Sequence, residues 1–300
     1  MKSTLEEQLA FVAVVDRGSI TAAAEGLDMT VSGVSRALNR LERKLGTTLL
    51  RRTTRRLELT EEGETFLGHV RSILAAVDSA EEAIAHHQDR PQGRLRINAA
   101  PSFMQFVLVP VIGEFHQRYP GIALELDTHD RFVDLLEQRV DLAIRIGELE
   151  DSSLHARPLG NSPLRLLASP EYLTRRGVPQ SVDDLAHHSL LGFSQLDHLN
   201  RWPLLDGRGE PLHVRPTLSA SSGTTLLELV MAGEGIACLA DYVTIAPRRQ
   251  GLLVDILPDQ TQFQTQRINV VYYRQTALSQ RARLFMDFLA ERLPGRYVSA

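Results

Sequence analysis

The spacing of apolar residues predicts a helix-turn-helix near the start of the chain. Between Gly18 and Gly63, two short segments with helical spacing meet at a turn. In the second segment, apolar residues recur at intervals of four, three and four positions, which places them on one face of a helix. They are Val34, Leu38, Leu41 and Leu45. We predict the motif over about residues 19–38, with Ser19 as the N-cap of its first helix.

The opposite face of the second helix carries hydroxyls, an amide and cations. Its residues are Ser32, Ser35, Arg36, Asn39, Arg40 and Arg43. A solvated polar face is the commoner reason for such a pattern. Here, however, the neighbouring sequence is also basic, since residues 36–56 hold eight Lys or Arg and a single acid, Glu42. Because base edges take hydrogen bonds and phosphates take cations, this face fits the major groove of DNA.

A short alternating segment at Leu57 and Leu59 predicts a strand beyond this helix, and four arginines precede it. Such a segment suits a wing that lies along a phosphate backbone. Val31 can touch a thymine methyl group but cannot hydrogen-bond a base. The residues predicted to meet bases or nearby phosphates are Val31, Ser32, Ser35, Arg36 and Arg40, and those predicted to hold the backbone are Arg52, Thr54 and Arg55.

Residues 61–88 predict one long helix with a heptad seam. Its apolar positions follow at intervals of four, three, four, three and four: Phe66, Val70, Ile73, Val77, Ala80 and Ile84. This repeat favours pairing with a second helix, the alternative being a helix packed on its own domain. The segment 89–93, which contains Pro91 and Gly93, should break the helix and act as an interdomain hinge.

Beyond Arg94, strand and helix patterns alternate. Apolar alternation near residues 95–99, 122–126 and 142–146 is separated by helical patterns at 103–118 and 130–138. A similar run covers about 163–255, with strands at 164–167 and 236–239 and a helix at 222–232. A strand at 267–273 and a helix at about 279–293 complete the pattern. This order predicts an open α/β sheet behind an N-terminal helical domain.

Charge and composition indicate two parts with different tasks. Residues 1–60 carry ten Lys or Arg against seven Asp or Glu, whereas the other 240 carry 23 against 30. A basic head on an acidic body suits a nucleic-acid module joined to another domain. The single cysteine, Cys238, cannot form an intramolecular disulfide, and its apolar neighbours predict burial in a strand. With no membrane-spanning run and no recognisable signal peptide, we expect a cytoplasmic protein.

The patterns typical of enzymes are incomplete in this chain. Gly233 and Gly235 lack the third glycine of a dinucleotide fingerprint. Residues 160–164 lack the closing glycine of a nucleophile elbow. Two pairs of histidines, at 86–87 and at 187–188, are adjacent in the sequence. They lack the i, i+4 spacing that would put two metal ligands on one face of a helix. We therefore expect no enzyme activity, no cofactor and no metal.

The N-terminal stretch resembles the winged helix-turn-helix of the LysR-type transcriptional regulators. The matching residues are Phe11, Val14, Gly18, Ser19, Ala22, Ala23, Leu27, Ser35, Arg36, Leu41, Glu42, Leu45, Gly46, Leu49, Arg52, Thr54, Arg55, Leu59, Thr60 and Gly63. One departure is Val31-Ser32, where many members have Gln-Ser or Gln-Pro. Segments 141–147, 169–173 and 233–236 resemble the family's effector domain, which is built like a periplasmic binding protein.

This resemblance implies an α/β fold in three parts. These are a winged helix-turn-helix DNA-binding domain at 1–60, a linker or dimerisation helix at 61–90, and an effector-binding domain at 91–300. The first lobe of the effector domain would comprise 91–162 and 268–300, and the second 163–267. The strands that cross between the lobes, near Leu164 and Ile268, would act as the hinge.

In such a domain we expect a ligand between the lobes, where strands end and helices begin. Backbone amides and hydroxyls at helix starts favour an anion, typically a carboxylate. The predicted contacts are Ala100, Ser102, Phe103, Thr128, His129, Arg145, Phe193, Ser194 and Ser222. Two alternatives stay open: Ser102 and Ser222 could act only as helix caps, and Arg145 could serve a structural salt bridge.

The combined prediction is a DNA-binding transcriptional regulator, dimeric or tetrameric, whose promoter binding responds to a small anionic metabolite. Its partners would be double-stranded promoter DNA, the effector and further copies of the chain, with no membrane. The alternative from another class is a solute-binding or catalytic α/β module whose N-terminal helices only mediate dimerisation. That alternative predicts no salt-sensitive affinity for DNA.

Overall fold

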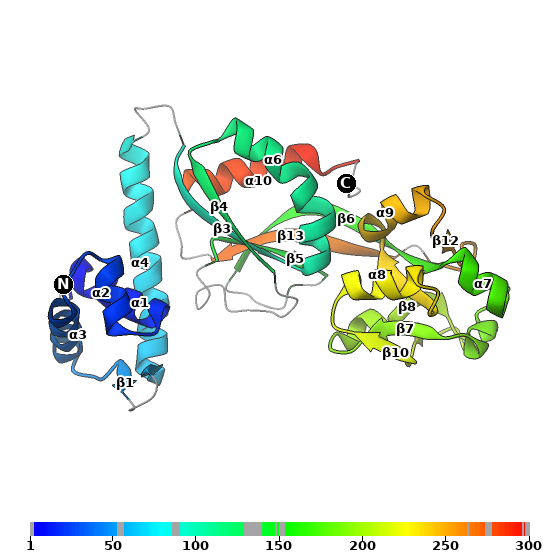
Figure 1. Cartoon of the computed structure of the whole chain (residues 1–300), viewed down its shortest axis with the longest axis horizontal. Coiled ribbons are helices and arrows are strands. Elements are labelled where there is room, and N and C mark those ends of the chain that lie inside the picture. Colours follow the sequence, from blue (N-terminus) through cyan, green and yellow to red (C-terminus); the bar gives the residue numbers. More distant parts are fainter. Residues whose placement is uncertain are drawn as a thin grey trace. The chain divides into compact units, whose positions relative to one another are not determined.

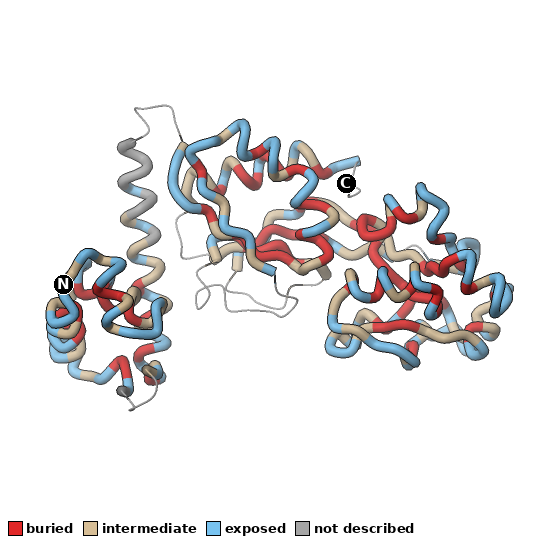
Figure 2. The backbone as a smooth tube through the Cα atoms, in the orientation of Figure 1, coloured by how far each residue is buried: buried red, intermediate tan, exposed pale blue. Residues whose placement is uncertain are grey.

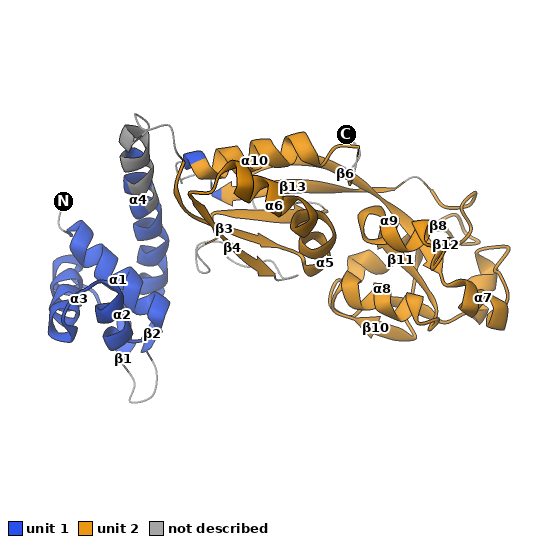
Figure 3. Cartoon of the chain, turned by 45° about the horizontal axis from the view of Figure 1, so that its top comes forward, with its two compact units in different colours: residues 1–89, 134–139, 273–280 blue, residues 90–133, 140–272, 281–300 orange. Residues whose placement is uncertain are grey.

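The computed structural model of the chain describes residues 3–52, 57–85, 91–128, 140–147, 149, 154–262, 264–273, 278–295 and 297 (Figure 1). These residues form two compact units, which are coloured separately in Figure 3. Unit 1 holds the described residues up to 85 together with 273 and 278–280, and unit 2 holds the rest. Each unit has buried apolar residues of its own (Figure 2).

Unit 1 begins with three helices whose caps follow from the sequence. They are α1 (Leu5–Arg17), α2 (Ile20–Gly26) and α3 (Val31–Leu45). Ser19 Oγ accepts a hydrogen bond from the Ala22 amide at 3.1 Å, and Thr30 Oγ1 accepts one from the Gly33 amide at 3.0 Å. Both helices of the predicted helix-turn-helix therefore start at a side-chain N-cap. The three helices share one core, which includes Phe11, Val14, Ala23, Val34, Leu38 and Leu41.

A two-stranded wing follows α3 and is fastened to it by hydrogen bonds. Its antiparallel strands are β1 (Leu50–Arg52) and β2 (Leu57–Leu59). Glu42 Oε1, on α3, accepts from the amides of Leu49 at 2.8 Å and Leu50 at 3.2 Å. Thr60 Oγ1 donates to the Thr48 carbonyl oxygen at 2.7 Å. Because these bonds pair backbone groups that burial removes from water, they set the position of the wing on α3.

A glycine is required where the chain leaves the wing for helix α4 (Glu61–Ala85). A Cβ atom on Gly63 would lie 2.2 Å from the carbonyl oxygen of Leu49. That oxygen also accepts the Thr60 amide at 3.0 Å, so it belongs to the hydrogen bonds at the base of the wing. A side chain at position 63 would therefore push the wing away from α4.

Helix α4 packs on α1 through its N-terminal half. Leu67 and Val70 are buried, and the ring of Phe66 lies 5.7 Å from that of Phe11, centroid to centroid. Further along α4, Ile73 is 42% exposed, and Leu74 and Val77 are half-buried. The predicted heptad seam is thus divided, because its first residues are covered by unit 1 itself. The predicted extension of the helix to residue 88 and the side chain of Ile84 lie outside the described part of the chain.

A buried carboxylate ties α1 to α3. Glu7 is 2% exposed, and its two carboxylate oxygens lie 2.8 and 2.9 Å from Lys44 Nζ. Arg40 Nε donates to Glu7 Oε1 at 3.3 Å, and the Thr4 amide donates to Oε2 at 3.0 Å. Burial by itself raises the pKa of Glu7, but the hydrogen bonds from Lys44, Thr4 and Arg40 outweigh it. The pKa of Glu7 falls from 4.5 to about 2, so the carboxylate is charged in the folded state.

Unit 2 is built on a mixed β-sheet with the strand order β10-β7-β11-β6-β13-β5-β3-β4, and β12 pairs with β6. Its strands are β3 (Gly93–Ala99), β4 (Ile122–Thr128), β5 (Leu142–Ile146), β6 (Leu154–Ala168), β7 (Leu190–Phe193), β10 (Leu218–Ala220), β11 (Ile236–Ala240), β12 (Val254–Asp255) and β13 (Thr265–Tyr273). A separate antiparallel pair is formed by β8 (Arg201–Leu205) and β9 (Pro211–His213).

Six α-helices of the described chain flank these strands. They are α5 (Pro101–Phe103), α6 (Val109–Arg118), α7 (Pro170–Arg176), α8 (Gly223–Met231), α9 (Asp241–Arg249) and α10 (Gln280–Arg292). Short 3₁₀ turns lie at Asp183–His187 and Asp197–Asn200. A π turn (Met104–Leu108) joins α5 to α6 just before Pro110, which has no amide hydrogen for the helix ladder.

The sheet divides unit 2 into two lobes. In lobe 1, the parallel strands β3, β4 and β5 pack with α5, α6 and α10, and the ring of Phe115 lies 5.0 Å from that of Phe285. Lobe 2 contains β7 to β12 with α7, α8 and α9. The central strands β6 and β13 run between the two lobes (Figure 1). β13 pairs with β5 at Ile268, and β6 pairs with β11 at Leu166.

Most elements predicted from the sequence are present, with shifted ends. The chief difference is β6, which begins ten residues before the predicted strand at Leu164. In the early half of β6 every residue except Leu159 is exposed or half-buried, and apolar residues do not alternate, so periodicity could not find it. Strands β8, β9 and β12 and helix α9 were also not predicted. The predicted helix at 130–138 lies outside the described residues. No described helix combines the length and apolarity needed to cross a bilayer.

Replacing Gly63 by Ala should lower the free energy of unfolding by about 1–3 kcal/mol, because the new Cβ overpacks against the Leu49 carbonyl. Gly113→Ala is the matched control. Its Cβ would meet nothing within 4 Å on α6, so this change should be neutral or stabilising by about 0.5–1 kcal/mol. Urea titration followed by far-UV circular dichroism measures both. Equal stabilities for the two variants would contradict the close approach at Gly63.

The depressed pKa of Glu7 predicts an acid-sensitive contribution to stability. This contribution is fully present above the unfolded value of 4.5 and is lost as the pH falls towards about 2. A shift of this size corresponds to at most about 3 kcal/mol. Glu7→Gln should therefore reduce stability at pH 7 and flatten its decline between pH 5 and pH 2, as measured by urea titrations across that range. The control is Glu6→Gln, whose side chain is 64% exposed; an unchanged pH profile in the Glu7 variant would refute this assignment.

Candidate nucleic-acid interface and ligand site

The outward face of α3 carries a row of polar side chains. Ser32, Arg36, Asn39 and Arg43 are all exposed and follow one another at three- or four-residue intervals. Arg36 Nε donates to the Ser32 carbonyl oxygen at 3.2 Å, which lays the Arg36 side chain back over the first turn of the helix. Val31, the first residue of α3, is 48% exposed. The row therefore presents cations, an amide and a hydroxyl on a helix whose other side is fixed in the core.

The DNA contacts predicted from the sequence fall in different places. Val31, Ser32 and Arg36 are exposed at the start of α3, and Ser35 is half-buried. Arg40 lies on the edge of α3 next to α1, where it pairs with the buried Glu7 carboxylate. Arg52 belongs to β1, but its side chain lies outside the described part of the structure, as do Thr54 and Arg55.

Asn39 and Arg43 were not among the predicted contacts, although the structure aligns them with Ser32 and Arg36. The signal was present in the sequence, since 32, 36, 39 and 43 form one helical row. Arg40, which was among the predicted contacts, lies beside this row. Its position 40° further round the helix from Arg36 turns it towards the carboxylates of α1.

Several predicted ligand contacts meet where α5 of lobe 1 approaches α8 and α9 of lobe 2. Ser102 is 8% exposed, and its Oγ lies 3.5 Å from the hydroxyl of Tyr242. The ring of Phe103 lies 5.4 Å from that of Tyr242 at an interplanar angle of 74°. A Cβ on Gly223 would lie 3.6 Å from Ser102 Oγ and 3.9 Å from Cζ of Phe193. Ser102 and Phe193 thus lie beside the first turn of α8, and Phe103 lies against Tyr242 of α9.

The two serines do not have the same local role. Ser222 is the N-cap of α8, with its Oγ accepting from the Thr225 amide at 3.3 Å. Ser102 lies inside α5 and makes no side-chain cap, since the N-cap position of α5 is Ala100. Ser222 therefore acts as a cap, whereas capping is wrong for Ser102. Ser102 directs its hydroxyl across to lobe 2 instead.

Arg145 has partners within lobe 1. It is 7% exposed on β5, and its Nη1 donates to Asn98 Oδ1 at 2.6 Å. Asn98 Nδ2 in turn donates to Asp127 Oδ2 at 3.1 Å. Burial lowers the pKa of the Arg145 guanidinium. This chain of side chains supports the structural alternative for Arg145.

The remaining predicted contacts do not join this group in the described structure. Thr128 is exposed at the end of β4, and His129 lies outside the described residues. Ser194 is exposed, and its amide donates to the Ala220 carbonyl oxygen at 3.0 Å. Tyr242, which the sequence analysis missed, follows the apolar strand β11 at the start of α9. The rule that ligands bind where strands end and helices begin would have selected it had α9 been predicted.

Cys238 is buried within β11, as predicted, and burial raises the pKa of its thiol. It therefore lacks the exposed thiolate character of a reactive cysteine. Among the residues that the structure describes, no three His, Cys, Asp or Glu side chains gather to hold a metal ion.

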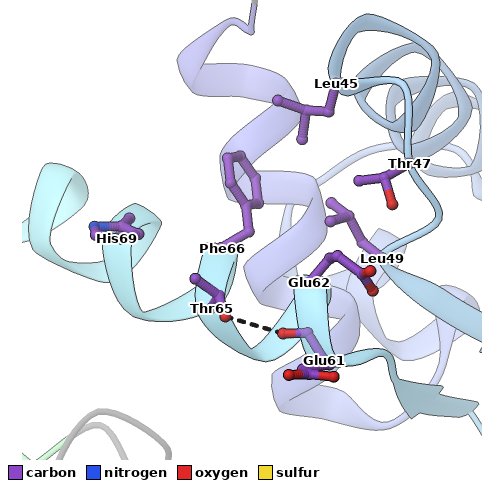
Figure 4. A pocket seen from close by; sticks show the side chains of 8 residues that line it. All are labelled: Leu45, Thr47, Leu49, Glu61, Glu62, Thr65, Phe66 and His69. Atoms are coloured by element: carbon purple, nitrogen blue, oxygen red, sulfur yellow. Dashed lines mark hydrogen bonds between the residues drawn. The ribbon is translucent and has the colours of Figure 1, made fainter.

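An open hollow of about 470 Å³ lies in unit 1 between the end of α3 and the start of α4 (Figure 4). Leu45 and Leu49 line one wall, and Phe66 lines the other (Figure 4). Thr47, Glu61, Glu62, Thr65 and His69 complete its lining. The hollow shares Phe66 with the partly exposed apolar stripe of α4.

Known sequences match both parts of the chain. Residues 5–64 match the family described as "Bacterial regulatory helix-turn-helix protein, lysR family", and residues 88–294 match "LysR substrate binding domain". The HTH-type transcriptional regulator CrgA of Neisseria meningitidis serogroup C (strain 8013) is 44% identical over 293 residues, which are 98% of each chain. An HTH-type transcriptional regulator of Xanthomonas campestris pv. campestris (strain 8004) is 36% identical over 298 residues, covering 98% of this chain and 86% of the relative.

Solved structures agree with these sequence matches. CrgA of Neisseria meningitidis, described as a LysR-type transcriptional regulator, superimposes with a TM-score of 0.67 at 43% identity, covering 97% of this chain and 99% of that one. Full-length AphB, described as the Vibrio cholerae virulence activator, gives a TM-score of 0.61 at 29% identity and covers 96% and 99%. With a winged helix-turn-helix, a two-lobed α/β domain and relatives over nearly its full length, the chain belongs to the LysR family of DNA-binding transcriptional regulators.

Proposed function

We propose that the exposed row on α3 reads the major groove of promoter DNA, with Ser32 and Arg36 at base edges and Arg43 at phosphates. The observation that carries this proposal is the exposed polar row on a helix whose opposite face is locked in the core. Arginine and serine supply the donors that base edges and phosphates accept. To bind a phosphate, Arg40 would have to leave the Glu7 carboxylate or contact both groups at once. This makes Arg40 a weaker candidate than Arg36 or Arg43.

We further propose that α4 pairs two copies of the chain, giving a dimer that can assemble into a tetramer. The stripe at Ile73, Leu74 and Val77 stays partly exposed on a helix that otherwise packs in unit 1. An apolar stripe at heptad spacing is buried most simply against a second helix. Two reading heads would then contact two half-sites of one operator. The matched family regions at 5–64 and 88–294 support domain limits of 1–60, 61–90 and 91–300.

For the effector we propose a small carboxylate bound between the lobes, with Ser102 and Tyr242 as its hydroxyl contacts. Both residues are nearly buried, and they come from different lobes. An oxygen of the ligand placed between them would connect α5 to α9 and so change the relation of the lobes. A ligand that binds one arrangement of the lobes better than another shifts the population towards it. Promoter contacts would follow that shift.

Arg36→Ala should weaken binding to the DNA immediately upstream of the protein's own gene by about 10–100-fold, the cost of losing a base contact. The measurement is a fluorescence-anisotropy titration at two salt concentrations, with an unrelated fragment for comparison. Arg208→Ala, which removes an exposed cation of unit 2, is the matched control and should leave affinity unchanged. Equal affinity for the two variants would remove Arg36 from the interface. Wild-type binding that is weak and insensitive to salt would contradict DNA reading altogether.

Ser102→Ala and Tyr242→Phe should each weaken binding of the effector by about tenfold, since each removes a hydrogen bond to a charged group. Thermal-shift screening of wild type against small mono- and dicarboxylates identifies a ligand, and calorimetry then compares the variants. Ser219→Ala, an exposed serine on β10, is the control. Unchanged affinity in both test variants would place the ligand elsewhere.

A further inference from the structure

A buried ion pair joins α4 to the end of α1. Arg71 Nη2 lies 2.6 Å from Asp16 Oδ1, and the two side chains are only 10% and 6% exposed. The pair is more C-terminal on α4 than Phe66 and Leu67, which belong to the core of the winged module, and it follows the buried Val70 directly. Beyond it, the stripe at Ile73 and Val77 is partly exposed. The pair therefore marks the point where α4 leaves the winged module.

This pair can orient α4 in a way that the apolar contacts cannot. Apolar packing has no preferred direction and tolerates small rotations, whereas an Arg–carboxylate pair has a narrow geometry. Losing the geometry would leave two nearly buried charges uncompensated. Asp16 lies just before Gly18, whose φ of 68° forms the turn into α2. Arg71 is thus connected directly to the corner that starts the helix-turn-helix.

A small change in the angle between α4 and α1 becomes a large displacement at the far end of α4. The part of α4 from Arg71 to Ala85 is about 20 Å long at 1.5 Å per residue. A tilt of about 10° at one end of such a lever moves the other end by about 3.5 Å, close to one base-pair step of DNA. If two copies pair along α4, the direction of α4 on α1 sets which half-site spacing the dimer can reach.

We propose that Asp16 and Arg71 are positioning residues that set the spacing between the two DNA half-sites. The proposal rests on the function proposed above, in which α4 pairs two copies and α3 reads DNA. It assigns to this pair no contact with DNA and no part in choosing the bases of a half-site. Loss of the pair should therefore change the spacing between the two DNA half-sites but not the base sequence of each half-site.

The test is a selection from random double-stranded DNA by the full-length protein, followed by sequencing of the bound pool. Wild type should select two half-sites at one dominant spacing. The double variant Asp16→Asn/Arg71→Met removes both charges of the pair together. It should select the same half-site with the spacing spread over neighbouring lengths, and its preference for the wild-type spacing should fall by about tenfold. Arg71→Lys, which keeps the charge, should recover most of that preference.

The control variant is Arg118→Met, which breaks an ion pair with Glu291 whose two side chains are half-exposed; its pool should match that of wild type. A sharp, unchanged spacing in the folded double variant would overturn the positioning role. If the double variant fails to fold, Asp16→Glu decides, because it keeps both charges and lengthens one side chain: a shifted or broadened spacing supports the positioning role, and a spacing identical to that of wild type overturns it. A wild-type pool without any enriched sequence would overturn the proposed function itself, and a pool of single half-sites would refute the pairing of heads.

Discussion

Helix α1 packs against α2, α3 and α4 at the same time, and the arrangement of unit 1 depends on these contacts. Its apolar residues Phe11 and Val14 enter the core shared with α2 and α3. Phe11 also meets the ring of Phe66 on α4, and Asp16 pairs with Arg71 further along the same helix. Glu7, on another side, binds the cations of α3. A helix of thirteen residues thus orients both the recognition helix and the linker helix.

The contact of α1 with α3 involves a trade between stability and DNA binding. A carboxylate as buried as Glu7 is tolerable only because Lys44, Arg40 and a backbone amide neutralise and hydrogen-bond it. The same arrangement occupies two cations of α3 that could otherwise meet phosphates. Of the cations on α3, Arg36 and Arg43 are exposed outside this arrangement, and they are the ones we propose for DNA. The net positive charge of the N-terminal segment therefore overstates what α3 can offer to a phosphate backbone.

In unit 2 the corresponding constraint is the pair of strands that runs between the lobes. Because β6 and β13 belong to both lobes, each lobe is folded from segments far apart in the sequence. Helix α5 packs close to α8 and α9. This contact brings together Ser102 and Tyr242, which are 140 positions apart in the sequence. Both hydroxyls lie at helix starts, where backbone amides still lack partners in the helix. These hydroxyls and amides are the reason for proposing an oxygen-rich ligand at this junction.

The sequence by itself determined the elements whose signal is local. The four-three-four spacing of α3 and the cap Ser19 depend on neighbours a few positions away, so they could be recognised from the chain alone. The family resemblance added the order of domains. Local patterns also indicated which residues start helices, and hence Ser102, Phe103 and Ser222.

Only the tertiary structure decided which of these residues share a surface. Arg40 and Arg36 are both arginines of one helix, yet Arg40 turns to Glu7 of α1, 33 positions away. Arg145 was equally suited to a ligand or to a structural role until Asn98 and Asp127 appeared beside it. Tyr242 was not selected because α9, which contains Pro247, was not predicted as a helix. Pairing of charges and hydroxyls depends on distances across the fold, and apolar periodicity carries no information about residues so far apart in sequence.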